Sequence, residues 1–179
     1  MKTERYTSTA VALHWLIGLM ILTSFAVGFY MSGLKFSPEK LKLYNWHKWA
    51  GVTIFMLVLI RCLWRLTHAV PPPPANMPAW QHKVADATHY VLYALMIVIP
   101  LSGWLMSSAK GFQTVYFGVV PLPDLLAKSK ELGETLELVH RWLNYSMIAI
   151  VAVHAAAALK HHFIDKDDVL RRMLPGKRV

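Results

Sequence analysis

Two histidines, His140 and His154, lie fourteen residues apart in one apolar stretch. Fourteen residues is close to four helical turns, so both imidazoles point to the same side, roughly 21 Å apart along the axis. Two more histidines occupy earlier apolar stretches: His14 lies early in the first and His47 at the head of the second. Polar groups inside a bilayer are costly and are usually functional. We therefore interpret the four histidines as ligands of two metal or haem centres at two depths in a membrane.

The elements that must position these histidines are four apolar stretches, each long enough to cross a bilayer. The second has the shortest apolar core, but the basic side chains at its ends can extend to the interface. The sequence therefore predicts an all-α, integral membrane four-helix bundle that forms a single domain over residues 1–179. The expected spans are about 9–31, 47–66, 86–107 and 138–160.

Two of the connections carry signals for the start of a helix. Ser37 followed by Pro38 predicts the N-cap and first residue of a small helix before the second span. In the longest connection, residues 108–137, Asp124 is a candidate cap for an amphipathic stretch that contains Leu125.

Composition supports a membrane protein and narrows the type of cofactor. The chain of 179 residues is 55% hydrophobic, above the roughly 45–50% of soluble domains. Its net charge of +9 indicates contact with lipid headgroups rather than binding of nucleic acid, because the sequence lacks the motifs of interleaved basic and aromatic residues that bind RNA. The single cysteine, Cys62, excludes an internal disulfide and a covalent Cys-x-x-Cys-His haem attachment. A haem here is therefore expected to be b-type.

Depth sorts the four histidines into pairs. Eleven basic residues flank one side of the spans and eight the other, which predicts that both termini are cytoplasmic. His14 and His154 then share the cytoplasmic half, and His47 and His140 share the outer half. Each pair could supply both axial ligands of one haem in the bundle core. Iron with two histidine ligands has no open position, so such a centre passes electrons.

Glycines and arginines near the ligands fit two haems. Gly18 and Gly51 each follow a ligand by four residues, which leaves room for a flat macrocycle, although small residues also serve plain helix packing. Arg61 lies fourteen residues after His47 on the same helix face, and Arg141 lies at the outer side of the membrane. Either arginine could neutralise a haem propionate; the alternative is that both extend to lipid phosphates.

A further histidine is a candidate for quinone chemistry. His161 lies two turns beyond His154 on its face, and histidine is suited to protonating a quinone near the inner centre. The alternative is solvation at the interface, which we favour for His68 and His82. His89 and His162 lie on the same cytoplasmic side.

Several segments carry a resemblance to a known family: His14-Trp15-Leu16, Asn45-Trp46-His47 through Gly51, the run from His140 to Tyr145, the run from His154 to His162, and the tail from Asp167 to Pro175. Over nearly its whole length the chain resembles the small bacterial cytochrome b561 family. The resemblance implies a four-helix inner-membrane protein with two b haems on the same four histidines. A characterised branch oxidises superoxide at the outer face and reduces ubiquinone. More distant relatives are cytochrome b subunits of hydrogenases and formate dehydrogenases.

The leading hypothesis is a di-haem oxidoreductase that carries electrons between the periplasmic face and the quinone pool, from superoxide to ubiquinone. The outer connections carry eight basic and five acidic residues, a net +3, which can steer a small anion but equally fits an ordinary solvated loop. A second hypothesis is a cytochrome b subunit relaying electrons for a partner dehydrogenase or hydrogenase. A third is a haem-free proton or metal transporter that uses the same histidines. The sequence identifies no protein partner.

Overall fold

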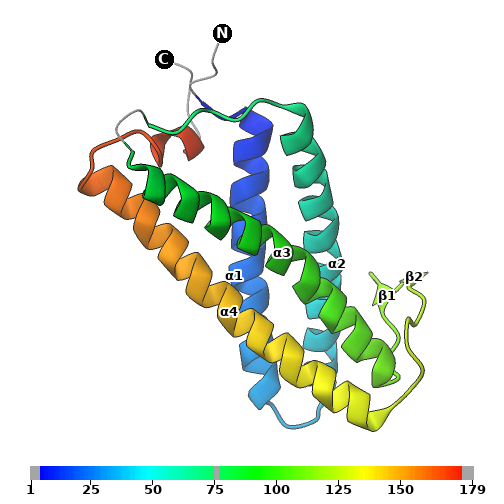
Figure 1. Cartoon of the computed structure of the whole chain (residues 1–179). Coiled ribbons are helices and arrows are strands. Elements are labelled where there is room, and N and C mark those ends of the chain that lie inside the picture. The colour runs from blue at the N-terminus through cyan, green and yellow to red at the C-terminus, as the bar shows by residue number, and fades with distance from the viewer. Residues whose placement is uncertain (1–4, 75–76, 175–179) are drawn as a thin grey trace.

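The computed structural model describes residues 5–74 and 77–174, and four long helices dominate it (Figure 1). Each helix is long and apolar enough to cross a membrane, with mean hydropathy between 1.6 and 2.0 in its most apolar window. The expected all-α bundle of four membrane-spanning helices is confirmed. The elements are α1 (Ser8–Gly33), α2 (Pro38–Thr67), α3 (Ala79–Ala109), β1 (Val115–Tyr116), β2 (Val120–Pro121), α4 (Lys130–Phe163) and the short 3-10 helix η1 (Arg171–Met173).

Side-chain caps define where α2 and α4 begin. The Ser37 hydroxyl accepts the Lys40 backbone N–H and Pro38 is the first helical residue, as the sequence predicted. The prediction of a separate small helix was wrong, because α2 continues without a break to Thr67. The Asp124 cap was also wrong, since residues 124–129 are not helical. Ser129 caps α4 instead, because its hydroxyl accepts the Leu132 N–H.

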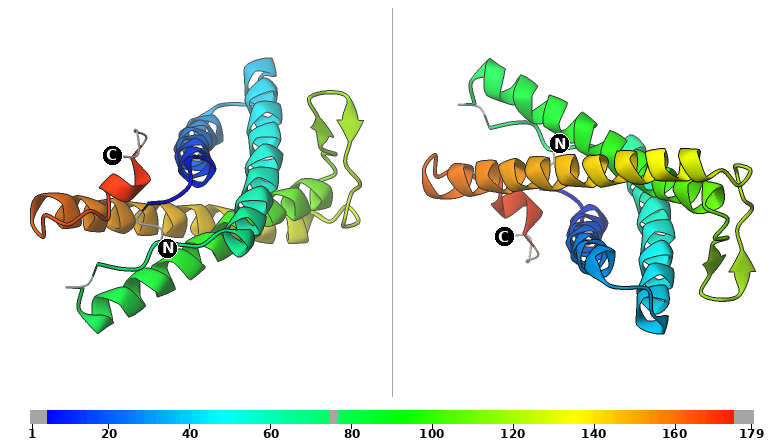
Figure 2. Two further views of the ribbon diagram at one scale, coloured as in Figure 1. Left: turned by 90° about the horizontal axis from the view of Figure 1, so that it is seen from above. Right: turned by 90° about the horizontal axis from the view of Figure 1, so that it is seen from below.

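The helices pack in sequence order. α1 lies against α2, α2 against α3, and α3 against α4, whereas α4 makes few backbone contacts with α1 or α2 (Figure 2). A small apolar core of Ile17, Ile54 and Val58 joins α1 to α2. Many large apolar side chains elsewhere on the helices are exposed, as expected when lipid is the surrounding solvent.

The two ends of the bundle carry different structures. At the tail end, defined by residues 164–174, the chain turns back after α4 towards α1, and Trp15 Nε1 donates to Met173 O at 2.6 Å. At the hairpin end, defined by β1 and β2, the antiparallel hairpin follows α3 and lies beside α2 (Figure 1). The sequence analysis did not predict this hairpin.

Candidate functional site

Four histidines on three helices meet in two pairs. The rings of His14 on α1 and His154 on α4 have centroids 6.2 Å apart, with an angle of 66° between their planes. The rings of His47 on α2 and His140 on α4 have centroids 6.3 Å apart, at 86°. The first pair lies towards the tail end and the second towards the hairpin end. The structure thus brings together the same two pairs that depth along the spans had sorted.

The spacing of each pair fits one metal ion between two imidazoles. Metal–nitrogen bonds in proteins are about 2 Å long, and a ring nitrogen lies about 1 Å from the ring centre, so a metal bound by both rings places their centroids about 6 Å apart. Both pairs meet that spacing, with centroids 6.2 and 6.3 Å apart. α4 contributes one histidine to each pair while making few backbone contacts with α1 or α2. The residues present therefore fit a cofactor held between these helices.

Hydrogen bonds fix the orientation of the His47 and His140 rings. His47 Nδ1 lies 3.1 Å from Ser24 O, an atom that only accepts, so this nitrogen carries the proton. His140 Nδ1 lies 2.8 Å from Ser102 Oγ, whose hydroxyl donates to Ile99 O at 2.8 Å. Hydrogen bonds of this kind set the tautomer of metal-binding histidines. They leave Nε2 of both rings free to bind a metal.

Glycines lie next to the histidine rings and along their faces. A Cβ added at Gly28 or Gly103 would lie 3.1 Å from Cε1 of His47 or His140, respectively. These two glycines let α1 and α3 approach the imidazoles closely. A Cβ at Gly18 or at Gly51 meets nothing within 4 Å, which fits their expected place beside a macrocycle.

The structure adds residues that sequence reasoning had missed. His89 on α3 lies with its ring centroid 5.5 Å from that of His154, although the sequence placed it only on the same side of the membrane. Ser24 and Ser102 had not been singled out at all. No local pattern marks these two serines, because each meets its histidine only across a helix–helix contact.

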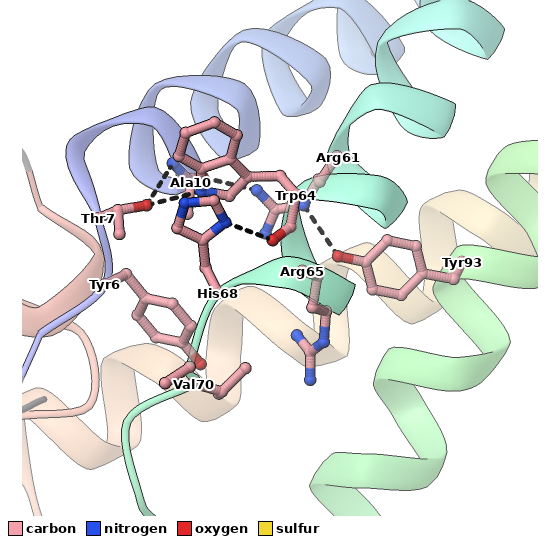
Figure 3. Close-up of a pocket in the computed structure, with 10 residues that line it drawn as sticks. Tyr6, Thr7, Ala10, Arg61, Trp64, Arg65, His68, Val70 and Tyr93 are labelled. Carbon is pink, nitrogen blue, oxygen red and sulfur yellow. Dashed lines mark hydrogen bonds between the residues drawn. The ribbon is translucent and has the colours of Figure 1, made fainter. Parts of the chain in front are cut away.

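Arg61 lines a pocket at the tail end, between the start of α1 and the end of α2 (Figure 3). Its Nη1 donates to Ala10 O at 2.6 Å and its Nε to Tyr93 Oη at 3.0 Å. Arg65 lines the same pocket, with its guanidinium carbon 5.8 Å from the Tyr93 ring centroid. Neither arginine forms an ion pair with any residue that the structure describes. Ala10 is one turn before His14, so the positive charge of Arg61 lies near the His14–His154 pair.

The other predicted residues lie apart from the four histidines. Arg141 Nη2 donates to Glu137 Oε1 at 2.8 Å, and Glu137 also pairs with Lys110. Arg141 directly follows His140, and adjacent helix residues do not share a face. At the tail end, His161 Nδ1 lies 2.6 Å from a carboxylate oxygen of Asp167. His161 therefore belongs to a hydrogen-bonded cluster of the tail, two turns from His154.

Comparison with known proteins shows which family the chain belongs to. A family model described as prokaryotic cytochrome b561 matches residues 5–176. The chain belongs to the prokaryotic cytochrome b561 family. Cytochrome b561 homolog 2 of Escherichia coli is 37% identical, over 96% of this chain and 92% of that relative. Cytochrome b561 homolog 1 of the same organism is 30% identical, over 98% and 99%. The probable superoxide oxidase CybB of Yersinia pestis is 28% identical, over 98% of each chain.

Family membership confirms the resemblance read from the sequence motifs. The protein is a membrane electron-transfer protein of the cytochrome b561 family, and the family implies that it binds haem b. Together with four helices able to cross a bilayer, this indicates a multi-pass protein of the inner membrane. The family also suggests quinone as a redox partner.

Proposed function

We propose that residues 1–179 form one transmembrane cytochrome b domain that holds two b haems and passes electrons from superoxide at the periplasmic face to ubiquinone. His14 and His154 hold one haem, and His47 and His140 hold the other. One observation carries the proposal: the two rings of each histidine pair face each other, and the two pairs lie at different levels of one membrane bundle. The ring centroids are 6.2 Å apart in one pair and 6.3 Å apart in the other.

The residues around each pair support electron transfer rather than bond chemistry. A b haem bound by two imidazoles supplies one-electron exchange at an iron without an open coordination position. Ser24 and Ser102 occupy Nδ1 of the His47 and His140 rings, which leaves Nε2 of each ring to bind the metal. We assign Arg61 to an anionic propionate at the tail end. It has no acidic partner among the described residues, and it has donors beyond the two that it uses.

Superoxide and ubiquinone are the finer part of the proposal. The printed name of the Yersinia pestis relative supports superoxide as the donor, and the net +3 of the hairpin-end connections can steer a small anion. Each superoxide loses one electron and becomes O₂. Ubiquinone takes up two electrons and two protons to become ubiquinol, so two superoxide ions are consumed per quinone. We assign the exchange of protons with a quinone at the tail end to His161, whose Nδ1 lies 2.6 Å from an Asp167 carboxylate oxygen.

The test is haem quantitation on the purified protein, followed by mixing with superoxide and a soluble ubiquinone analogue. We expect two b haems per chain, reduction of both by superoxide, and two superoxide ions consumed per quinone reduced. His47→Ala and His140→Ala are expected to lose one haem and the superoxide reaction together. One haem or none per chain would reject the two-centre assignment.

Two further measurements, co-purification of a partner and transport in vesicles, separate the proposal from its alternatives. A stoichiometric partner protein, together with no superoxide reaction by the isolated chain, would assign the protein as a cytochrome b subunit of a larger enzyme. A colourless protein that moves protons or metal ions across vesicles would instead support the transporter. For the quinone site, His161→Ala is expected to slow quinone reduction with both haems retained, whereas Asp167→Asn keeps the imidazole and is expected to slow it less.

A further inference from the structure

The connection from α3 to α4 begins with a segment that contains no charged residues. Residues 111–123 contain no Asp, Glu, Lys, Arg or His, although loops outside a membrane are ordinarily rich in polar residues. β1 and β2 form an antiparallel hairpin within this segment. A three-residue loop, 117–119, joins the two strands, and its first two residues, Phe117 and Gly118, have positive φ angles of 49° and 73°, as tight hairpin loops often require. The segment is thus a defined element.

Contacts with α2 place the hairpin at the level of the membrane. Trp49 Nε1 donates to Val115 O at 2.7 Å, and the hydroxyls of Thr53 and Tyr116 are 2.9 Å apart. Trp49 begins the apolar core of α2, and Thr53 lies one turn further into it. The hairpin therefore turns back along α2 and lies beside the first turn of its apolar core, instead of projecting beyond the end of the bundle (Figure 1).

The hairpin exposes several apolar side chains. Phe117 is 60% exposed and Val119 78% exposed, and in Figure 2 the hairpin stands to one side of the four helices. Phe112 and Val120 are exposed as well. Large apolar side chains exposed on an uncharged loop favour an interaction site over an ordinary solvated loop.

The depth of the hairpin and its free backbone edges identify what covers this surface. A two-stranded hairpin leaves the outer backbone groups of both strands without strand partners, and such groups are not tolerated in lipid hydrocarbon. The headgroup region accepts them, because water reaches it and aromatic side chains concentrate there. Trp49 and Phe117, with ring centroids 5.2 Å apart, lie together at this level. The geometry points to a hairpin that inserts its apolar turn, Phe117 to Val120, into the headgroup–acyl boundary of the bilayer beside α2.

Spin labels at the turn test this placement in the full-length holoprotein. In a Cys62→Ser background, Phe117→Cys and Val119→Cys each carry a nitroxide, in nanodiscs that hold one copy of the protein. Lys130→Cys is the matched control, because its side chain lies at the same end of the bundle and is 91% exposed. Oxygen, which partitions into lipid, and a water-soluble nickel chelate are the two collision probes. We expect the ratio of oxygen to nickel collisions to be at least threefold higher at positions 117 and 119 than at 130.

Two results would overturn the inference. Nickel collisions at 117 and 119 equal to those at 130 would place the hairpin in water. Shielding found only in larger discs with two copies would assign the surface to a contact between copies of the chain. Circular dichroism of each labelled variant checks that the helices are intact, and the two turn positions serve as independent variants should one of them disturb the fold.

Discussion

Hydrogen bonds at Nδ1 make the two histidine pairs unequal. Ser24 and Ser102 hold the rings of the His47–His140 pair. No hydrogen bond to the ring of His14 or His154 is found within residues 5–74 and 77–174. Oriented rings bind a metal more tightly, because less rotational freedom is lost on binding. We therefore expect the haem near the hairpin end to be the more firmly held of the two.

Replacing Ser102 with alanine tests that expectation. The Ser102→Ala variant loses the acceptor of His140 Nδ1–H, and loss of such a partner typically costs 10–100-fold in metal affinity. We expect at least tenfold faster loss of the haem near the hairpin end to an excess of a haem-scavenging apoprotein, followed by absorbance. Ser108→Ala is the control, since Ser108 is equally buried but its hydroxyl bonds Trp104 O and no histidine. Equal rates in the two variants would remove Ser102 from the haem site.

His89 gives a second test at the scale of single residues, because two rings lie near His154. His14 has the centroid distance of 6.2 Å that suits a shared metal, whereas His89 lies at 5.5 Å, too close for a metal in line between the rings. We expect His14→Ala to bind one haem per chain and His89→Ala to bind two, measured by haem extraction and absorbance. The reverse result would make His89 the ligand.

The pairing of the four histidines could be predicted, and the residues that contact their rings could not. Helical periodicity and depth along four apolar spans were enough to pair His14 with His154 and His47 with His140. The partnership of Ser24 with His47 depends on how α1 is rotated against α2, which no local pattern records. The closeness of His89 to His154 has the same origin, because it depends on the packing of α3 against α4.

Among the elements, α1 allows a test of whether a macrocycle lies along its face. Gly18 and Gly33 both lie on α1, and a Cβ at either meets nothing within 4 Å. Gly18 is one turn after His14, whereas Gly33 is the last residue of the helix. We expect Gly18→Leu to lower the haem content towards one per chain, because its side chain would occupy the space of the haem. Gly33→Leu is expected to keep two.

Both substitutions replace glycine with a better helix former, so a loss of helix would not account for a difference between them. Circular dichroism and haem content measured on the same samples separate folding from binding. Two haems in Gly18→Leu would remove Gly18 from the haem site.

The elements themselves differ in how far the sequence revealed them. Hydropathy revealed the four spanning helices, and the Ser37–Pro38 cap revealed the start of α2. Asp124 was a plausible cap, but residues 124–129 are not helical and α4 begins only after Ser129. The hairpin escaped prediction because its strands are two residues long and are held by α2. A bond between side chains 63 residues apart, Thr53 and Tyr116, has no local signal.

At the scale of the whole molecule, the proposed function depends on which end faces the periplasm. The basic residues, eleven on the side of the termini and eight on the other, favour cytoplasmic termini. That orientation places the His47–His140 pair and the hairpin at the periplasmic side, and the His14–His154 pair with His161 at the cytoplasmic side. The orientation is therefore the feature of the whole molecule on which the superoxide assignment depends.

Reporter fusions after Val179 measure the orientation. With a cytoplasmic C-terminus, we expect a fused green fluorescent protein to be bright in cells and a fused alkaline phosphatase to be inactive. The matched control joins the same reporters after Lys35, which follows α1 directly and is expected to give the opposite result. If the fusions at Val179 report the periplasm instead, superoxide formed there meets the His14–His154 pair first. The net +3 of the hairpin-end connections would then face the cytoplasm and could not steer it.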